Sequence, residues 1–408
     1  MDLLTLETVR ATDRARGIEY AIRDILGIAK EVEKSGKKVI YLNIGDPAKF
    51  DFETPAQVRK ALANATNSGC NYYASSEGVP LLRDAVAEKE KRINSVPISG
   101  EDVIITSGIS EGIQFLTGAL VQPGDEVLMP GPTYPPYFSF VKFFGGTPVV
   151  YRTIEDSNWL PDLEDLRNKI TQRTRLLVIV NPNNPTGSLY DEKTLKQMLD
   201  IAAEHKLLVA SDEIYDRLVY DSRFTSTAAL AKDIPVVGLN GFSKTYVMTG
   251  WRLGYLYFHD PTNVLEELKE AIAKESRIRL CASTPVQYAA VEALKGSQTR
   301  IAKMVRILKE RRDHFLRRIR SIKEFSCTTP RGAFYLFPKI SLGERWKSDK
   351  DFAIDLVKKT GVLVVNGSGF DQTYGAGHFR VVFLPPIDII HEAVDRIEQF
   401  MRSNTAKP

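Results

Sequence analysis

Side chains of unlike chemistry follow a series of short apolar runs in the middle of the chain. The runs at 103–106, 126–129, 175–180, 207–211 and 235–239 each end in polar or aromatic groups. In open α/β sheets ligands bind at the carboxyl ends of the strands, so these groups are the first candidates for a site. They comprise an amide-rich turn, an aromatic ring, an amide side chain, a carboxylate with a phenol, and an amine: Gly108–Ser110, Tyr134, Asn184, Asp212 with Tyr215, and Lys244.

Such a set of groups can hold a phosphorylated aromatic ring. Backbone amides that open a helix favour an anion, and a lysine amine becomes a nucleophile when burial or nearby positive charge lowers its pKa. A metal centre is not indicated, because the chain has only five histidines and they are not clustered. No G-x-G-x-x-G follows any of the apolar runs, which argues against a dinucleotide-binding dehydrogenase.

Three motifs carry a more specific signal: NPNNPTG (181–187), SDEIY (211–215) and GFSKTYVMTGWRLGY (241–255). At these separations they closely resemble the fold-type-I aminotransferases of class I, which depend on pyridoxal phosphate (PLP). The resemblance covers nearly the whole chain, from LNIGDP near residue 45 to FRVVF near residue 380. It implies PLP as the cofactor and allows roles to be transferred residue by residue.

The expected catalytic residues are Lys244, Asp212 and Tyr215. Lys244 matches the family's Schiff-base lysine, which the substrate displaces and which then moves the substrate's α-proton. Asp212 matches the aspartate that pairs with the pyridine nitrogen, while Tyr215 and Asn184 match the two contacts to the ring's 3′ oxygen. Taken singly, Lys244 is a typical surface lysine, Asp212 a typical helix N-cap, and the other two ordinary loop or helix residues.

The residues expected at the cofactor's phosphate share amide, hydroxyl or guanidinium donors: Gly108, Ile109, Ser110, Ser243 and Arg252. Arg252 follows Lys244 by eight residues, the family spacing, and guanidinium suits two-point phosphate contacts. Gly241 departs from the pattern, because serine is frequent at that position. The resemblance therefore implies one phosphate contact fewer.

Two tyrosines complete the expected cofactor site. Tyr134 matches the aromatic residue that stacks on the pyridine ring, although ordinary core packing also suits it. Tyr73 matches a tyrosine that reaches the phosphate of the neighbouring subunit, which implies a homodimer with shared active sites. A tyrosine without such a task is the alternative.

The expected substrate-binding residues are Gly45, Asn184 and Arg380. Arg380 matches the arginine that clamps the α-carboxylate, and a buried arginine in an apolar strand needs an anionic partner. Without the resemblance, an edge-strand arginine facing water is the simpler interpretation. Gly45 matches the glycine whose backbone lines the substrate site, with a glycine turn as the alternative.

The elements that must position these residues are indicated by the hydrophobic pattern. Seven apolar runs lie between about 100 and 260, and helical stretches separate most of them, which indicates an α/β fold. We expect a large domain with a mostly parallel seven-stranded sheet covered by helices, plus a smaller α+β domain. Segment 262–325 reads as long helix. The expected division is an N-terminal segment with part of the small domain (1–48), a large PLP-binding domain (49–295) and a small C-terminal domain (296–408).

Bulk properties limit the partners. The net charge of +4 is too small to indicate nucleic acid or a membrane surface as partner. No apolar run is long enough for a membrane helix, and the N-terminus has no apolar signal core. Three widely spaced cysteines argue against a disulfide framework. We therefore expect a cytoplasmic protein whose partners are small amino acids and 2-oxo acids.

The finer resemblance is to prokaryotic alanine aminotransferases, through RGIEYAIRD (16–24), NIGDPAKFDFETP (43–55), IRLCASTP (278–285) and GAGHFRVVFLPP (375–386). It implies transfer of the amino group between L-alanine and 2-oxoglutarate, giving pyruvate and L-glutamate by a ping-pong mechanism. An aspartate or aromatic aminotransferase, or a PLP-dependent β-lyase, remains an alternative. Arg14 and Arg16 are candidates for a place near the pocket, with surface solvation as the competing explanation.

Overall fold

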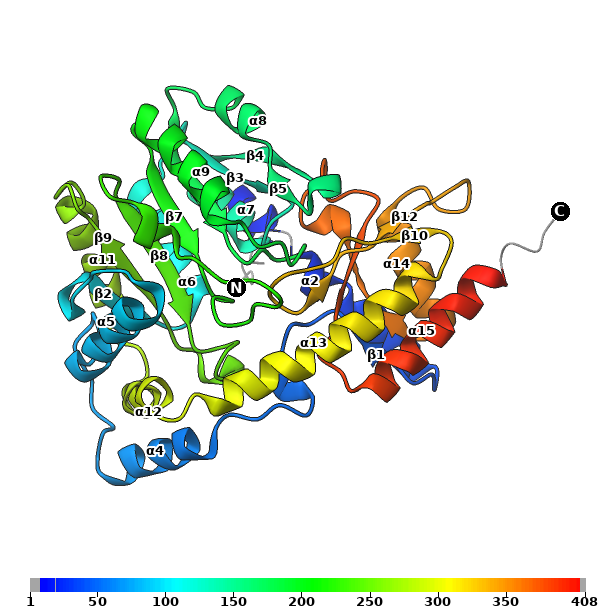
Figure 1. Cartoon of the computed structure of the whole chain (residues 1–408), viewed down its shortest axis with the longest axis horizontal. Coiled ribbons are helices and arrows are strands. Elements are labelled where there is room, and N and C mark those ends of the chain that lie inside the picture. The colour runs from blue at the N-terminus through cyan, green and yellow to red at the C-terminus, as the bar shows by residue number, and fades with distance from the viewer. Residues whose placement is uncertain (1–7, 19, 404–408) are drawn as a thin grey trace, which may run out of the picture.

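The computed structural model describes residues 8–18 and 20–403. A large sheet with its helices forms one part of the molecule, and a smaller group of strands with α14 (Asp349–Thr360) and α15 (Ile387–Arg402) forms the other (Figure 1). The long helix α13 (Thr299–Arg320) runs along both parts. Residues 1–7 of the expected N-terminal segment and 404–408 of the expected C-terminal domain lie outside the described residues.

The large sheet has the strand order β2-β9-β8-β7-β6-β3-β4-β5. β3, β4, β6, β7 and β8 are mutually parallel, while β9 is antiparallel to both of its neighbours and β5 is antiparallel to β4. The mostly parallel seven-stranded sheet is therefore confirmed, with the two-residue β5 as an added eighth strand. The bounds are β2 Val103–Thr106, β3 Glu126–Gly131, β4 Thr147–Ile154, β5 Leu160–Pro161, β6 Thr174–Val180, β7 Leu208–Asp212, β8 Val236–Gly241 and β9 Gly254–His259.

The middle parts of the strands are mostly apolar because both faces of the sheet are covered. In β6, Leu177 and Ile179 pack in one core cluster, while Leu176 and Val178 pack in another on the opposite face. Alternate side chains of a strand point to opposite faces, so a sheet covered on both sides leaves few positions for solvated residues, here near strand ends and at the edge. The covering helices are α6 (Ile109–Leu120), α7 (Pro136–Phe143) and α11 (Glu266–Ile278) on one face, and α5 (Pro80–Asn94), α9 (Glu192–Glu204) and α12 (Thr284–Lys295) on the other, while α4 (Ala56–Asn67) packs against α12.

The smaller part has its own core, made by α13, α14, α15 and short strands. β15 (Phe379–Val382) lies between β11 (Tyr335–Leu336) and β14 (Val365–Asn366), antiparallel to both. The N-terminal region joins this part, because β1 (Ile40–Tyr41) pairs with β13 (Val362–Leu363) and α3 (Leu26–Lys34) packs in the same core. The remaining elements are α1 Asp13–Arg16, α2 Ala21–Asp24, α8 Leu163–Asn168, α10 Thr227–Leu230, β10 Phe325–Ser326 and β12 Lys339–Ile340, with the 3₁₀ helices η1 Pro47–Lys49, η2 Gly100–Asp102, η3 Glu155–Ser157, η4 Thr249–Trp251 and η5 Gly367–Gly369.

The helix expected over 262–325 is three helices, α11, α12 and α13. Leu280 adopts a φ of +77° after α11, and Pro285 lies in the first turn of α12, where proline's missing N–H is tolerated. Gly296 ends α12, and a Cβ at this position would lie 2.6 Å from the Glu292 carbonyl oxygen. Local backbone geometry thus divides a segment whose charge and composition favour helix throughout.

Within the described ranges, no helix is both long and apolar enough to span a membrane. The same residues contain no group of three or more His, Cys, Asp or Glu side chains placed to hold a metal ion.

Candidate active site

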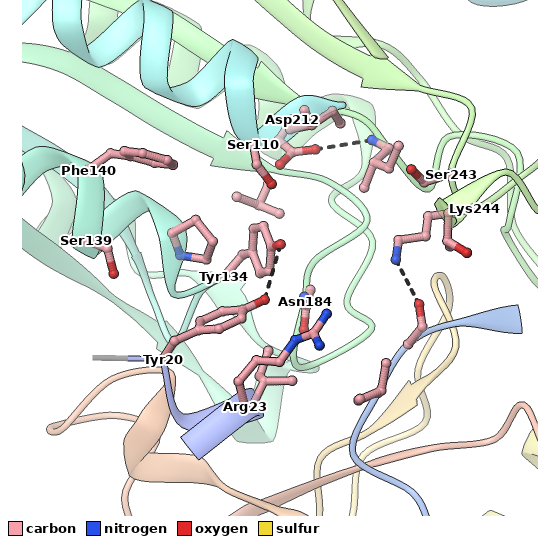
Figure 2. Close-up of a pocket in the computed structure, with 18 of the residues that line it drawn as sticks. Tyr20, Arg23, Ser110, Tyr134, Ser139, Phe140, Asn184, Asp212, Ser243 and Lys244 are labelled. Carbon is pink, nitrogen blue, oxygen red and sulfur yellow. Dashed lines mark hydrogen bonds between the residues drawn. The ribbon is translucent and has the colours of Figure 1, made fainter. Parts of the chain in front are cut away.

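A cavity of about 880 Å³ lies at the carboxyl ends of β7 and β8. Both parts of the molecule contribute to its wall, and the stick view shows Lys244, Asp212, Asn184 and Tyr134 gathered around it with Tyr20 and Arg23 (Figure 2). The residues expected from the sequence that line it are Gly45, Ile109, Ser110, Tyr134, Asn184, Asp212, Tyr215, Ser243, Lys244, Arg252 and Arg380.

Lys244 follows the end of β8, where the chain leaves the sheet in a turn. Its Nζ donates to the carbonyl oxygen of Gly45 at 2.8 Å (Figure 2). Burial lowers the pKa of Lys244 to about 8, and the nearby positive charges of Arg380 and Arg252 act in the same direction. The unprotonated amine, which a nucleophile or a general base requires, is therefore far more populated near neutral pH than in an ordinary lysine.

Asp212 is the last residue of β7 and is 2% exposed. Its carboxylate accepts from the Ile214 backbone N–H at 3.2 Å and from the Tyr137 hydroxyl at 3.1 Å. Burial raises the pKa of Asp212 to about 6, and in the described structure no arginine, lysine or histidine forms an ion pair with it. No helix begins after Asp212, so the N-cap interpretation is wrong.

Arg380 lies in the middle strand of the small sheet and is 1% exposed. Its guanidinium lies over the rings of Tyr335 and Phe370, at 4.4 and 4.7 Å from their centroids. It donates to Asn184 Oδ1 at 2.8 Å and to the Asn43 carbonyl oxygen. No carboxylate of the described chain pairs with it and its Nε is buried without a partner, so the edge-strand interpretation is wrong and an anionic partner is required.

Tyr215 and Gly45 lie beside the same aromatic pair. The hydroxyls of Tyr215 and Tyr335 are 2.6 Å apart. A Cβ at position 45 would lie 2.4 Å from the Tyr335 hydroxyl and 2.7 Å from the Phe334 ring. Gly45 is therefore required by the close approach of these rings and is more than a turn residue.

The residues expected at the phosphate meet at the start of α6. Gly108 precedes α6 with a φ of +87°, and Ile109 and Ser110 form its first turn, whose free amides favour an anion. Arg252 donates to the carbonyl oxygens of Ser107 and Thr249, at 3.3 and 3.0 Å. Gly108 does not line the cavity. A Cβ at this position would lie 2.6 Å from Arg252 Nη2, so only glycine leaves room for the Arg252 guanidinium.

The structure also explains the glycine at position 241, where serine is frequent in the family. A Cβ at Gly241 would lie 3.0 Å from the Gly254 Cα and 3.1 Å from the Leu253 carbonyl oxygen. The close approach of β8 and β9 thus leaves little room for a hydroxymethyl group.

Tyr73 is the one expected residue that the structure does not bring to the site. It is 79% exposed and lies away from the cavity of its own chain. Its expected contact is with a neighbouring subunit, so this placement leaves the expectation untested.

Several residues of the cavity were missed by sequence reasoning. Tyr20 and Arg23 line it from α2 and the residue before it, and the Tyr20 and Tyr134 hydroxyls are 3.4 Å apart (Figure 2). Arg14 lies only at the margin, over the ring of the cavity residue Phe143, and Arg16 pairs with Asp13. The sequence EYAIRD (19–24) contains both residues and belongs to one of the segments that resemble alanine aminotransferases. That resemblance could have indicated Tyr20 and Arg23 as cavity residues.

The sequence model of the family "Aminotransferase class I and II" matches residues 37–397. The glutamate-pyruvate aminotransferase AlaA of Escherichia coli K12 is 35% identical over 403 residues, which cover 97% of this chain and 98% of that protein. The alanine aminotransferase of Mycobacterium tuberculosis is 37% identical, covering 92% of this chain and 88% of its own length. The solved structure of an alanine aminotransferase from Pyrococcus furiosus superposes with a TM-score of 0.95 and 53% identity, covering 97% of this chain and all of that one.

Proposed function

The chain belongs to the class I and II aminotransferases, and from this premise we propose that it transfers the amino group between L-alanine and 2-oxoglutarate. The products are pyruvate and L-glutamate, formed in two half-reactions at one site. Enzymes of this family use PLP. The observation that carries the proposal is the meeting of Lys244, Asp212, Arg252 and Arg380 around one cavity.

The groups present suit PLP at each of its reactive ends. Arg252, Ser243 and the first turn of α6 offer a guanidinium, a hydroxyl and amides to the phosphate. Asp212, buried without a cation, suits a protonated pyridine nitrogen, and the Lys244 amine would bond to the aldehyde carbon. Tyr134 would stack on the ring, and Tyr215 and the amide nitrogen of Asn184 would contact its 3′ oxygen. The bound cofactor supplies an acceptor for the electron pair left when the substrate's Cα–H bond breaks.

The protein's own groups then orient the substrate and move its proton. Arg380 binds the α-carboxylate through two parallel hydrogen bonds, which fixes the amino acid in one orientation. Lys244, with its pKa near 8, takes the proton from the α-carbon of the substrate and would deliver it to the C4′ carbon of the cofactor. The Asp212 carboxylate would stabilise the positive charge on the pyridine nitrogen. Gly45, which has no side chain, leaves space for the substrate.

Arg23 supports the choice of 2-oxoglutarate as partner of alanine. Four cationic side chains line the cavity, and Lys244, Arg252 and Arg380 have roles in the scheme above. Arg23, on α2, is the fourth, and in the described structure no carboxylate pairs with it. A five-carbon dicarboxylate needs a second positive charge, whereas the methyl group of alanine does not. Arg23 is therefore assigned to the distal carboxylate of glutamate and 2-oxoglutarate.

The first test is the visible absorption of the purified protein, before and after L-alanine and then 2-oxoglutarate. We expect a band from the cofactor bonded to Lys244 that alanine bleaches and 2-oxoglutarate restores. A band that alanine leaves unchanged would reject the alanine assignment and direct the search to aspartate or aromatic substrates. Ammonia release from a β-substituted alanine without a 2-oxo acid would instead indicate a lyase.

The second test is Arg23→Gln, with alanine and glutamate compared as amino donors. Loss of a charged hydrogen bond lowers kcat/KM for glutamate by about 10- to 100-fold, while the value for alanine is expected to change little. Arg14→Gln is the matched control, because Arg14 lies at the cavity margin over the Phe143 ring. Equal losses for both donors would reject the assignment of Arg23.

We also propose a cytoplasmic homodimer with Tyr73 completing the partner's phosphate site. In support, Tyr73 and its neighbour Tyr72 are both exposed aromatic side chains, so a surface suited to burial lies there. Cys70, Cys281 and Cys327 are all free, as is usual in a reducing compartment. The division at 48/49 and 295/296 is retained as a proposal for the domain limits.

A further inference from the structure

The cavity contains a second carboxylate, Asp46, which has no role in the function proposed above. Asp46 and Asp212 are the two acidic residues in the cavity wall. Asp46 belongs to the segment NIGDP, which continues from β1 and carries Gly45 into the cavity. Since Asp212 lies at the far end of β7, the two carboxylates reach the cavity from different parts of the molecule.

The position of Asp46 is fixed by hydrogen bonds on both sides. Its Oδ1 accepts from the Thr249 hydroxyl at 2.7 Å and from the Ala48 backbone N–H at 3.1 Å. The Thr249 carbonyl oxygen in turn accepts from Arg252 at 3.0 Å. Meanwhile the preceding carbonyl, of Gly45, accepts from Lys244 Nζ at 2.8 Å. One dipeptide therefore contacts the lysine through its backbone and the Thr249–Arg252 turn through its side chain.

Four charged groups act on Lys244, and three of them have other tasks in the proposed function. In the proposed function Arg252 and Arg380 would bind the phosphate and the α-carboxylate, and Asp212 would pair with the pyridine nitrogen; all three line the cavity. The neutral groups nearby are the phenols of Tyr215 and Tyr335 and the ring of Phe334, whose centroid is 5.8 Å from Nζ. Asp46 is the fourth charged group, and in the described part of the chain its carboxylate accepts hydrogen bonds from Thr249 and Ala48 but forms no ion pair.

A carboxylate near an amine favours the ammonium form, and this effect is strongest where water is excluded. Burial, Arg252 and Arg380 all disfavour a proton on Lys244, whereas Asp46 is the largest influence in the opposite direction. The balance between them sets the pKa near 8. A group that must accept a proton and then return it needs such an intermediate value.

We propose that Asp46 is a positioning residue for proton transfer, whose carboxylate keeps the transferred proton on Lys244 Nζ until the lysine delivers it to the C4′ carbon of the cofactor. The inference rests on the proposed function. In the step concerned, the Cα–H bond of the substrate breaks, its electron pair stays with the substrate and cofactor, and an N–H bond forms on Lys244. The resulting ammonium forms beside the carbonyl oxygen of Gly45, and the next residue, Asp46, lies in the same cavity wall. The same N–H bond breaks when Lys244 delivers the proton to the C4′ carbon of the cofactor.

The test variant is Asp46→Asn, which removes the charge while its amide oxygen can still accept from Thr249. The pKa of Lys244 is measured directly in the full chain with the cofactor removed, by competitive acetylation with acetic anhydride followed by peptide mass spectrometry. We expect the value to fall by at least about half a unit, because an opposite charge has been lost. In the loaded enzyme, the pH profile of the half-reaction with alanine is expected to move in the same direction, toward lower pH.

Three further variants separate charge from structure. Asp46→Glu keeps the charge, and Thr249→Val keeps it while removing the hydrogen bond, so both should leave the pKa of Lys244 close to that of the unmodified chain. Glu53→Gln removes a carboxylate farther along the same segment that pairs with Arg59 at the surface, and should also have no effect. If Asp46→Asn does not fold, a shift in the Thr249→Val variant as large as half a unit would reject the proposal.

An unchanged labelling profile in Asp46→Asn overturns the inference, even if activity falls, because it assigns Asp46 a structural role only. Failure of the proposed function gives a different result. In that case the unmodified chain lacks the cofactor band, or alanine does not bleach it, while the labelling experiment still reports whether Asp46 acts on Lys244.

Discussion

Arg380 is a fully buried cation that forms no ion pair with a carboxylate of the described residues. Two aromatic rings enclose its guanidinium, and two oxygens occupy part of its donor set. A buried charge without a counter-ion is costly, so the free protein keeps this residue at the expense of stability. A substrate carboxylate removes that cost on binding. The same argument applies to Asp212. Burial raises the pKa of this carboxyl, and a bound cation would lower it again.

Arg380→Lys tests this interpretation of the α-carboxylate site. The lysine keeps a positive charge but loses the planar two-point contact and the stacking on Tyr335 and Phe370. We expect kcat/KM for alanine to fall by about 100-fold or more, while the affinity for PLP changes little. Steady-state kinetics and a PLP titration measure the two effects. A variant with unchanged kinetics would remove Arg380 from the substrate site.

Tyr137→Phe tests how Asp212 is held in its charged form. Burial keeps the pKa of Tyr137 well above its usual range, so the phenol stays protonated and donates to Asp212. Without that bond the pKa of Asp212 should rise further, since a hydrogen bond to the carboxylate favours ionisation. We expect PLP to bind about 10-fold more weakly, and the loss to be greater at low pH than at high pH.

Equilibrium dialysis of PLP across a pH series is the measurement. Tyr151→Phe is the matched control, because Tyr151 is equally buried and donates to the Val178 carbonyl oxygen instead. Equal weakening in both variants would show that Tyr137 contributes through packing alone.

At the scale of elements, the carboxyl end of β7 carries two neighbouring acids with different tasks. Asp212 faces the cavity, while Glu213 points into the protein and accepts from Ser211, Ser226 and the backbone N–H of Thr227. These contacts attach the start of α10 to the strand that carries Asp212. Burial raises the pKa of Glu213 to about 8, so this acid is largely protonated at neutral pH.

Glu213→Gln should therefore change how stability depends on pH. The folded chain holds this proton up to about pH 8, whereas an unfolded chain releases it near the ordinary value of 4.5. Stability is then lost as pH rises through this window, because the folded state binds more protons. Glutamine resembles the protonated acid and has no such dependence. Between pH 5 and 9 the variant should gain about 1 to 3 kcal/mol relative to the unmodified chain.

Thermal unfolding at each pH gives the comparison. Glu192→Gln serves as the control, because Glu192 forms an exposed pair with Lys196 and its loss should not alter the pH dependence. Parallel stability curves for Glu213→Gln and the unmodified chain would contradict the assignment of the raised pKa to Glu213.

At the scale of the whole molecule, the proposed dimer makes a prediction about shared sites. Tyr73→Ala and Lys244→Ala each remove one component, and each variant alone should be nearly inactive or bind PLP poorly. If Tyr73 completes the partner's site, mixing them and exchanging subunits creates dimers with one intact site. Random mixing should restore about one quarter of the original activity. Light scattering should give twice the chain mass of 45.7 kDa, and no restoration would place Tyr73 outside the site.

A feature could be predicted from the sequence when it depends on residues within one short segment, and could not when it depends on contacts between distant segments. All seven apolar runs are strands, because a strand buried on both faces is specified by its own composition. The motif residues Lys244, Asp212, Tyr215 and Asn184 line one cavity, because strand ends of a parallel sheet share an edge. By contrast, the division of segment 262–325 into three helices depends on backbone geometry at Leu280 and Gly296 that charge and composition do not reveal.

The sequence by itself thus determined the fold class, the family and the residues that follow each strand, since these depend on patterns within short segments. Only the tertiary structure decided that Arg380 is buried between two rings, that Tyr137 donates to Asp212, and that Asp46 and Arg23 face the same cavity as Lys244. These contacts join segments separated by tens to hundreds of residues. Their energies depend on burial and distance, which arise only when the two parts of the molecule pack together.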